Sequence, residues 1–78
     1  MSQFFLLGTS ACHLCEQAEA LLVSLQIPYS KIDIAEHEQY QANYAVKIPV
    51  LLSPDEQHEL CWPFDKDKLI NFQHIIAY

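Results

Sequence analysis

The spacing of hydrophobic positions differs from one segment of this chain to the next. In the first 28 residues it predicts a strand followed by a helix. Residues 3–7 form an apolar run rich in Phe and Leu that stops at Gly8, a pattern typical of a buried strand. From Cys12 until shortly before Pro28, apolar residues recur at spacings of three and four, which indicates a helix. The apolar face of this helix comprises Leu14, Ala18, Leu21, Leu22 and Leu25. Two side chains just ahead of it could cap its first turn, those of Thr9 and Ser10.

A second strand and a polar helix follow. Residues 29–34 alternate with a period of two, which predicts a half-exposed strand. Its two faces are Ser30, Ile32 and Ile34 on one side and Tyr29, Lys31 and Asp33 on the other. Residues 36–44 are polar and weakly helical, and Tyr40 and Tyr44 are spaced to lie on one face of that helix.

The last third of the chain predicts a hairpin and a final helix. Residues 49–53 and 58–62 are short apolar runs separated by a Pro-Asp-Glu turn, so we expect two antiparallel strands. Asp65 is a candidate N-cap for a helix that runs through Ile76. The apolar face of this helix comprises Leu69, Phe72, Ile75 and Ile76.

The order of these elements, β-α-β-α-β-β-α, defines an α/β fold. Two strands joined by a helix are parallel through a right-handed crossover, whereas the last two strands form an antiparallel hairpin. We therefore expect a small mixed sheet flanked by helices. A length of 78 residues corresponds to one domain over residues 1–78.

The charge balance excludes some classes of partner. The formal net charge is −6, and the 4 basic residues are all Lys. Phosphate backbones and anionic membranes bind clustered Lys and Arg, so we expect no nucleic-acid partner and no membrane partner. The first apolar run, Phe4 to Leu7, is shorter than the core of a signal peptide or a membrane span, so we expect a cytoplasmic protein. We also expect a monomer.

The cysteines carry the candidate chemistry. Their number, 3, is odd, which argues against a scaffold held together by disulfides. Cys12-His13-Leu14-Cys15 lies between the predicted first strand and helix. A cysteine at a helix N-terminus faces unpaired backbone N–H groups and the positive end of the helix dipole, which stabilise its thiolate. We therefore predict that Cys12 attacks a disulfide and that Cys15, one turn later, resolves the mixed disulfide.

Three side chains near this motif affect the pKa of the Cys12 thiol. A protonated His13 would lower that pKa, so His13 is a candidate for pKa tuning, or else an exposed spacer. Glu16 and Glu19 place negative charge near the first turn, which raises the pKa of the thiol. We therefore expect a reactive Cys12 that is not extremely acidic.

Two other interpretations of the cysteines remain open. Cys-x-x-Cys is also a metal-ligand spacing, and His58-x-x-Cys61 would complete a Cys₃His zinc set. Because His58 and Cys61 point to opposite faces of a strand, we assign no metal ligands, and an iron–sulfur cluster would need further ligands. Alternatively, the chain is an adaptor whose cysteines are idle. Cys61 itself is expected to be an inert buried residue.

Three features match one known superfamily. Gly8-Thr9-Ser10-Ala11-Cys12-His13-Leu14-Cys15, the segment Val46-Lys47-Ile48-Pro49-Val50-Leu51-Leu52 and the element order together resemble glutaredoxins and thioredoxins. The tail Trp62-Pro63-Phe64-Asp65 resembles that of small glutaredoxin-like proteins of bacteria. The resemblance implies a thioredoxin-like fold and a thiol–disulfide oxidoreductase that reduces protein or low-molecular-weight disulfides.

The resemblance also implies a binding surface beside the cysteines. It predicts that the Ile48–Pro49 bond is cis, that Ile48 and Pro49 line the substrate groove, and that Lys47 lies where a glutathione carboxylate binds. Because few X–Pro bonds are cis, the residues alone would indicate a trans proline at the start of an edge strand, and only the resemblance makes a cis bond the expectation. Lys47 is equally consistent with a solvated surface residue.

The chain departs from the glutaredoxin pattern around glutathione. It lacks the Gly-Gly turn with which glutaredoxins hold glutathione, since its only Gly is Gly8. Asp65 and Asp67 are near the position of the family's glutathione-binding acidic pair, but they also fit a helix cap and a first-turn charge. We expect no organic cofactor, because the dithiol itself carries the electrons. The expected partners are a disulfide-containing protein or small thiol as substrate, and either a reductase or glutathione as the electron donor.

Overall fold

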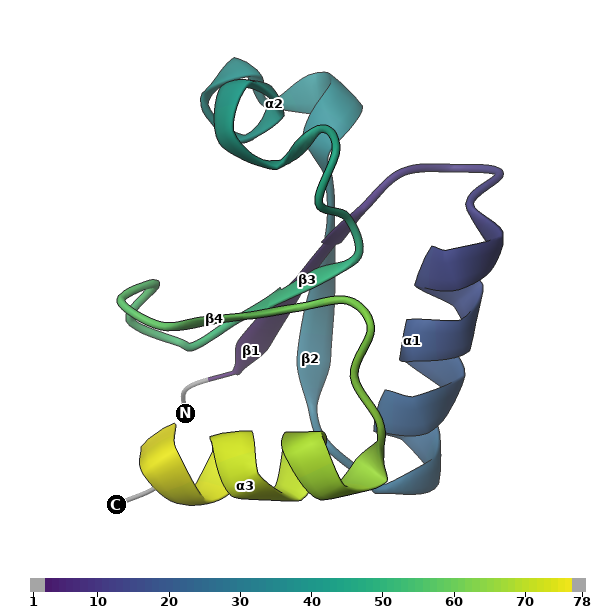
Figure 1. Cartoon of the computed structure of the whole chain (residues 1–78). Coiled ribbons are helices and arrows are strands. Elements are labelled where there is room, and N and C mark those ends of the chain that lie inside the picture. The colour runs from purple at the N-terminus through teal and green to yellow at the C-terminus, as the bar shows by residue number, and fades with distance from the viewer. Residues whose placement is uncertain (1–2, 77–78) are drawn as a thin grey trace.

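The computed structural model describes residues 3–76, which form a mixed α/β structure (Figure 1). In chain order the elements are β1 (Phe4–Gly8), α1 (His13–Ser24), β2 (Tyr29–Asp33), the 3-10 helix η1 (Ile34–Glu36), α2 (Glu38–Tyr44), β3 (Val50–Leu52), β4 (Glu59–Cys61) and α3 (Lys66–Ile76). This order confirms the predicted succession of strands and helices, with η1 added between β2 and α2. None of the described helices is long and apolar enough to cross a membrane.

The sheet has 4 strands in the order β2-β1-β3-β4. Strands β1 and β2 are parallel and bring Gly8 opposite Asp33, whereas β3 is antiparallel to β1 and brings Val50 opposite Leu7. Strand β4 is antiparallel to β3. The predicted small mixed sheet is therefore confirmed. The segment after β1 and the segment before β3 lie at the same end of the sheet, which is where the cysteine motif is found.

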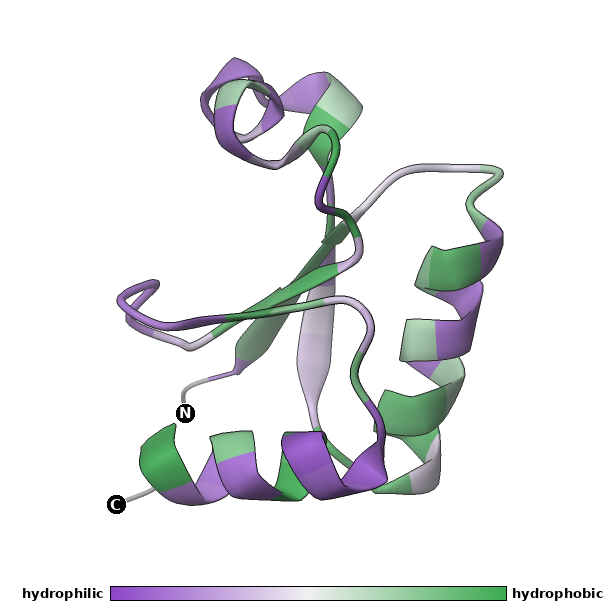
Figure 2. Ribbon diagram, in the orientation of Figure 1, coloured by the Kyte–Doolittle hydropathy of each residue, from purple (hydrophilic) through white to green (hydrophobic). Residues whose placement is uncertain are grey.

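Each face of the sheet has its own hydrophobic core. On one face, Leu6 and Leu51 pack with residues of α1 and α3. On the other face, Leu7 and Val50 pack with Ile34 and with residues of α2. Neighbouring residues of one strand enter different cores because strand side chains alternate between faces. Figure 2 shows the resulting hydrophobic central strands and the more hydrophilic α2.

The core is built from a few side chains without solvent contact. Leu7, Leu22, Leu51 and Leu69 are each 0% exposed. Full burial of a side chain of this size contributes about 1.5–3 kcal/mol to the free energy of unfolding. The sheet and its helices are therefore held mainly by these contacts.

Two predicted core residues are instead on the surface. Leu14 is 44% exposed and Ile75 is 70% exposed. The buried stripe of α1 is Cys15, Ala18 and Leu22, and that of α3 is Leu69, Phe72 and Ile76. Both stripes have spacings of three and four. In each helix the mispredicted residue immediately precedes a buried one, and so it is rotated about 100° away from the sheet.

Several element boundaries also differ from the prediction. Strand β2 ends at Asp33, because the Asp33 side chain accepts a hydrogen bond from the Ala35 backbone N–H at 2.9 Å and turns the chain into η1. Ile34, predicted in the strand, therefore begins η1. Tyr40 and Tyr44 do form the packed face of α2, and their hydroxyl groups donate to Glu56 and Glu59.

The predicted N-cap of the last helix is confirmed, and it can be tested. The Oδ1 atom of Asp65 accepts a hydrogen bond from the backbone N–H of Lys68 at 2.9 Å. We expect Asp65→Ala to lower the free energy of unfolding by about 1 kcal/mol, because this N–H loses its acceptor. Asp65→Asn keeps an acceptor and serves as the control. Urea unfolding followed by circular dichroism measures both, and equal losses in the two variants would contradict the capping role.

Candidate functional site

The loop between β1 and α1 sets the position of both cysteines. Ala11 adopts a left-handed backbone conformation with φ of 57°, and this turns the chain sharply before the helix. Cys12 follows with an extended backbone and is the N-cap of α1. The expectation that Thr9 or Ser10 caps the helix was wrong, because the turn at Ala11 places Cys12 at the helix end instead.

Cys12 and Cys15 form a disulfide in the structure, with their Cα atoms 5.2 Å apart. The backbone N–H of Cys15 donates a hydrogen bond to Sγ of Cys12 at 3.1 Å. The helix therefore directs an N–H group at the sulfur of Cys12, as expected for a cysteine that caps a helix. The same interaction stabilises negative charge on that sulfur when the disulfide is open.

The two sulfurs differ in access to solvent. Cys12 is half-buried, whereas Cys15 is only 8% exposed and belongs to the buried stripe of α1. An incoming disulfide therefore reaches Cys12 more easily than Cys15. The order of events, in which Cys12 attacks and Cys15 resolves, stays a prediction.

Gly8 makes room for the sulfur of Cys15. A Cβ atom at position 8 would lie 3.0 Å from Sγ and 3.3 Å from Cβ of Cys15. Such a distance is shorter than ordinary van der Waals contact, so an added Cβ would require the Cys15 side chain to shift by a few tenths of an ångström. The only Gly of the chain therefore stands where the buried sulfur packs against the end of the central strand.

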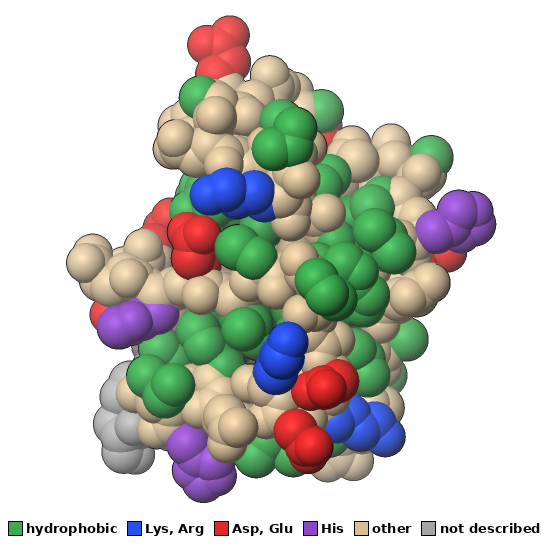
Figure 3. Space-filling model, viewed as in Figure 1, with side chains coloured by type: hydrophobic (Ala, Val, Ile, Leu, Met, Phe, Trp, Pro, Cys, Tyr) green, Lys and Arg blue, Asp and Glu red, His purple; other side chains and the backbone are tan. Residues whose placement is uncertain are grey.

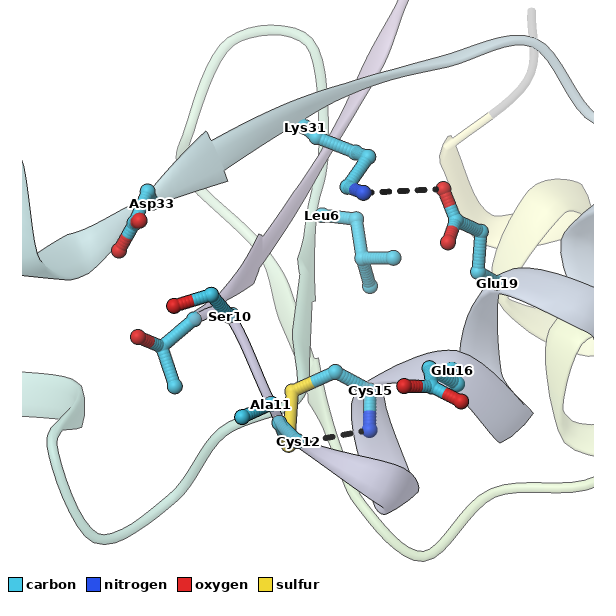
Figure 4. A pocket seen from close by; sticks show the side chains of 11 residues that line it. Leu6, Ser10, Ala11, Cys12, Cys15, Glu16, Glu19, Lys31 and Asp33 are labelled. Atoms are coloured by element: carbon cyan, nitrogen blue, oxygen red, sulfur yellow. Dashed lines mark hydrogen bonds and ion pairs between the residues drawn. A yellow bond between two sulfur atoms is a disulfide. The ribbon is translucent and has the colours of Figure 1, made fainter.

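The disulfide opens onto a pocket with a volume of about 340 Å³ (Figure 4). Its base is formed by β1, and its walls are formed by the first turns of α1 and by the edge strand β2. The charged side chains that line it are Glu16, Glu19, Lys31 and Asp33. Figure 4 shows the disulfide on one side of this pocket and a pair of charged side chains, Lys31 and Glu19, on the other.

Glu19 stabilises the wall of the pocket that lies opposite the cysteines. Its Oε2 atom lies 3.5 Å from Nζ of Lys31 and accepts a hydrogen bond from the Tyr29 hydroxyl at 2.7 Å. Burial, followed by this hydrogen bond and the charge of Glu19, raises the pKa of Tyr29 to about 12. Tyr29 therefore stays protonated and remains a donor throughout the range of pH in which thiols titrate.

His13 and Leu14, between the cysteines, both face solvent. His13 is exposed at the first position of α1, and Leu14 is 44% exposed. The role of His13 in pKa tuning stays a prediction. Leu14, predicted to be buried, therefore adds exposed apolar surface beside the cysteine pair.

The second predicted segment lies at the same end of the sheet. The Ile48–Pro49 bond is cis, as the resemblance implied, and the Trp62–Pro63 bond is cis as well, which was not predicted. Pro49 is buried, Ile48 is half-buried and Lys47 is exposed. Pro49 directly precedes Val50, the partner of Leu7, so it lies beside the end of β1 that leads to Cys12. These three residues do not line the pocket between α1 and β2.

Cys61 is a separate thiol on β4. It is half-buried, which corrects the expectation of a buried residue, because β4 is an edge strand of the sheet. Its Sγ lies 3.4 Å from Oε2 of Glu59. Burial, with the hydrogen bond and charge of Glu59, raises the pKa of the Cys61 thiol, and Lys47 opposes this shift.

The four residues of the alternative zinc set are not gathered into one site. Within residues 3–76 there is no group of three or more His, Cys, Asp or Glu side chains placed to hold a metal ion. His58 is exposed, and its backbone pairs with Ser53 across the hairpin.

Sequence reasoning did not identify Gly8, Lys31 and Asp33 as parts of the site. Gly8 was interpreted as the end of a strand and as the start of the segment that resembles glutaredoxins, without a contact to Cys15, and Lys31 and Asp33 were interpreted only as one face of the next strand. The parallel pairing places Gly8 opposite Asp33 and Leu6 opposite Lys31. A signal for Lys31 and Asp33 existed in the predicted parallel crossover, because it sets the ends of both strands side by side.

Comparisons with known proteins agree with this architecture. Residues 3–72 match the family described as Glutaredoxin-like domain (DUF836). An X-ray structure of protein XcR50 from X. campestris is 29% identical over 92% of this chain and 96% of that chain, with a TM-score of 0.83. A solution NMR structure of protein Ne2328 from Nitrosomonas europaea is 30% identical over 91% of this chain and 89% of that chain, with a TM-score of 0.78. No significant match was found among curated proteins.

The close approach of Gly8 to Cys15 leads to a test by double substitution. We expect Gly8→Ala to lower the free energy of unfolding by about 1–3 kcal/mol, because the added Cβ overfills the contact with Sγ. In a Cys15→Ala background, which lacks the sulfur, the same substitution should cost clearly less. Urea unfolding of the four proteins measures the coupling, and an equal cost in both backgrounds would show that the sulfur is not the obstacle.

The raised pKa of Cys61 predicts slow alkylation of that thiol. With Cys12 and Cys15 oxidised, Cys61 should react with iodoacetamide at pH 8 more slowly than a model peptide thiol, because less of it is thiolate. Glu59→Gln removes the negative charge, so it should lower the pKa and speed the reaction. Glu56→Gln is the matched control, since Glu56 also accepts a bond from a tyrosine, Tyr40. Mass spectrometry follows the rate, and no acceleration in Glu59→Gln would contradict this assignment.

Proposed function

The chain belongs to the Glutaredoxin-like domain family (DUF836), and on that premise we propose that it is a thiol–disulfide oxidoreductase. The coarser part of this statement, a thioredoxin-like fold that carries a Cys-x-x-Cys pair, follows from the family and the structure together. The proposal adds the activity, which is reduction of protein or low-molecular-weight disulfides in the cytoplasm by Cys12 and Cys15.

One observation supports the proposal most. Cys12 caps α1, receives a hydrogen bond from the N–H of Cys15 and lies close enough to Cys15 to close a disulfide. Both forms of a redox couple are thereby possible without rearrangement of the fold. A pair of cysteines that served only packing would not need one sulfur at the rim of a pocket.

The electrons balance within the dithiol. The Cys12 thiolate attacks one sulfur of the substrate disulfide, and the other substrate sulfur leaves as a thiolate that takes up a proton. The Cys15 thiol gives up its proton and attacks the sulfur of Cys12 in the mixed disulfide. The second substrate thiolate leaves, and the Cys12–Cys15 disulfide remains. Two electrons have passed from the dithiol to the substrate, so no organic cofactor takes part.

Substrate contact extends beyond the cysteines in this proposal. Ile48 and Pro49 lie beside the end of β1, where the half-buried Ile48 is proposed to offer backbone and apolar surface to a substrate segment while the buried Pro49 shapes the backbone beside it. The exposed Lys47 is available to a carboxylate. His13 is proposed to tune the pKa of Cys12 from the first turn of α1. Glutathione or a reductase returns the electrons, and the protein acts as a monomer.

Replacement of each cysteine tests the proposal. We expect Cys12→Ser to abolish disulfide reductase activity, because the attacking sulfur is lost. Cys15→Ser should instead accumulate a mixed disulfide on Cys12, because nothing resolves it. Cys61→Ser is the matched control and should keep the activity. The measurements are insulin or small-disulfide reduction and the mass of trapped adducts.

The outcomes separate the proposed function from its competitors. Retained activity in Cys12→Ser would contradict the mechanism. A metal analysis of the same freshly purified protein distinguishes the ligand interpretation, in which Cys15→Ser lowers metal content and no adduct forms. In an adaptor, neither substitution would change any of these readouts.

A further inference from the structure

We propose that the pocket beside the disulfide selects substrates whose reacting cysteine is flanked by a positively charged side chain. This inference rests on the proposed function and names the substrate class of the same site. It concerns the pocket between α1 and β2, which is distinct from the surface at Pro49.

The pocket is placed to receive the residue next to a substrate cysteine. Both Cys12 and Cys15 line it, and its volume is about 340 Å³. This volume is near the lower end of about 300–1,000 Å³ that is typical of small-molecule sites, so it suits a side chain better than a large cofactor. Because Cys12 lines the pocket, a side chain next to a substrate cysteine that is bonded to Cys12 can reach it.

The lining leaves an excess of negative charge. Lys31 is the lining cation, and it is paired with Glu19 at 3.5 Å. Glu16 and Asp33 form no ion pair with any Lys or His in the described part of the chain. The hydrogen bond that Asp33 accepts from the Ala35 N–H does not cancel its charge. Two carboxylates near the disulfide are therefore free to meet a cation.

The fold explains why these charges converge. Glu16 and Glu19 are three residues apart in α1 and share one side of the helix. Lys31 and Asp33 are two residues apart in β2 and point to the same face of the sheet. Because β2 is an edge strand, this face is not covered beyond α1, and the four side chains form the rim of an open pocket.

The same charges act against glutathione as a preferred partner. Glutathione has more carboxylates than ammonium groups, so its disulfide is an anion at neutral pH. Its approach to a pocket with surplus carboxylates, on a chain of net charge −6, is opposed by like-charge repulsion. A protein segment with Lys or Arg next to its cysteine has the complementary charge.

The test compares two peptide disulfides of equal length, with the cysteine flanked by Lys in one and by Glu in the other. The reduced protein is mixed with each peptide, the reaction is quenched by alkylation, and the second-order rate constants are measured. At low ionic strength we expect the Lys peptide to react at least about fivefold faster. The ratio should fall at high salt, where charges a few ångströms apart are screened.

Single-charge variants locate the effect. Glu16→Gln and Asp33→Asn should each lower the ratio of the two rates. The matched control is Asp67→Asn, which removes the same charge from the first turn of α3. Asp67 is not among the residues that line the pocket, and its neighbour Lys66 lies instead beside Ala20 and Ser24, in the half of α1 away from the cysteines. The ratio cancels any change in the reactivity of Cys12, because such a change affects both peptides equally.

Each outcome decides one point. Equal rates, or a faster Glu peptide, would overturn the charge selectivity while leaving the proposed function intact. A ratio that falls as much in Asp67→Asn as in the pocket variants would also overturn it, because the preference would then come from net charge alone. Failure to reduce either peptide would overturn the proposed function together with this inference.

Discussion

The first turn of α1 packs so closely against the end of β1 that a Cβ atom on residue 8 would lie only 3.0 Å from the sulfur of Cys15. The rest of the site depends on this contact. Because Cys15 is drawn into the buried stripe of the helix, its partner Cys12 is left one turn earlier, at the N-cap and at the edge of solvent. This one steric contact therefore accounts for the different solvent exposure of the two sulfurs of the motif.

The sheet places this contact at the edge of its hydrophobic cores. The central strands carry the most buried side chains and divide them between two cores, one under α1 and α3 and one under α2. The cysteine loop and the segment at Pro49 lie where β1 ends and β3 begins, at the edge of these cores, and Ile48 packs against the second of them. Surface loops at strand ends tolerate reactive or unusual geometry, such as the left-handed Ala11, because the core does not depend on them.

Charge is distributed unevenly around the redox pair. Tyr29 and Lys31 converge on Glu19 and fix one wall of the pocket. On the face seen in Figure 3, hydrophobic side chains gather across the middle and charged side chains are scattered around them. Away from the pocket, the hydroxyl groups of Tyr40 and Tyr44 in α2 donate hydrogen bonds to Glu56 and Glu59 of the β3–β4 hairpin and so tie the hairpin to that helix. The acidic residues therefore serve two purposes: some join elements of the fold, and Glu16 and Asp33 leave net negative charge at the disulfide.

The kind and order of the strands and of the three α-helices, the cysteine pair at a strand-to-helix junction and the cap at Asp65 could all be predicted from the sequence, because periodicity, capping and motif spacing are local properties. The cis bond before Pro49 came only from the resemblance to a superfamily. Tertiary structure decided which of two adjacent residues faces the core, as with Leu14 and Cys15, because a helical period does not fix the rotation of the helix against its sheet. It also decided the contact of Gly8 with Cys15 and the meeting of α1 with β2 in one pocket. These depend on residues distant in sequence, whose approach is set only when the strands pair and the helix packs against them.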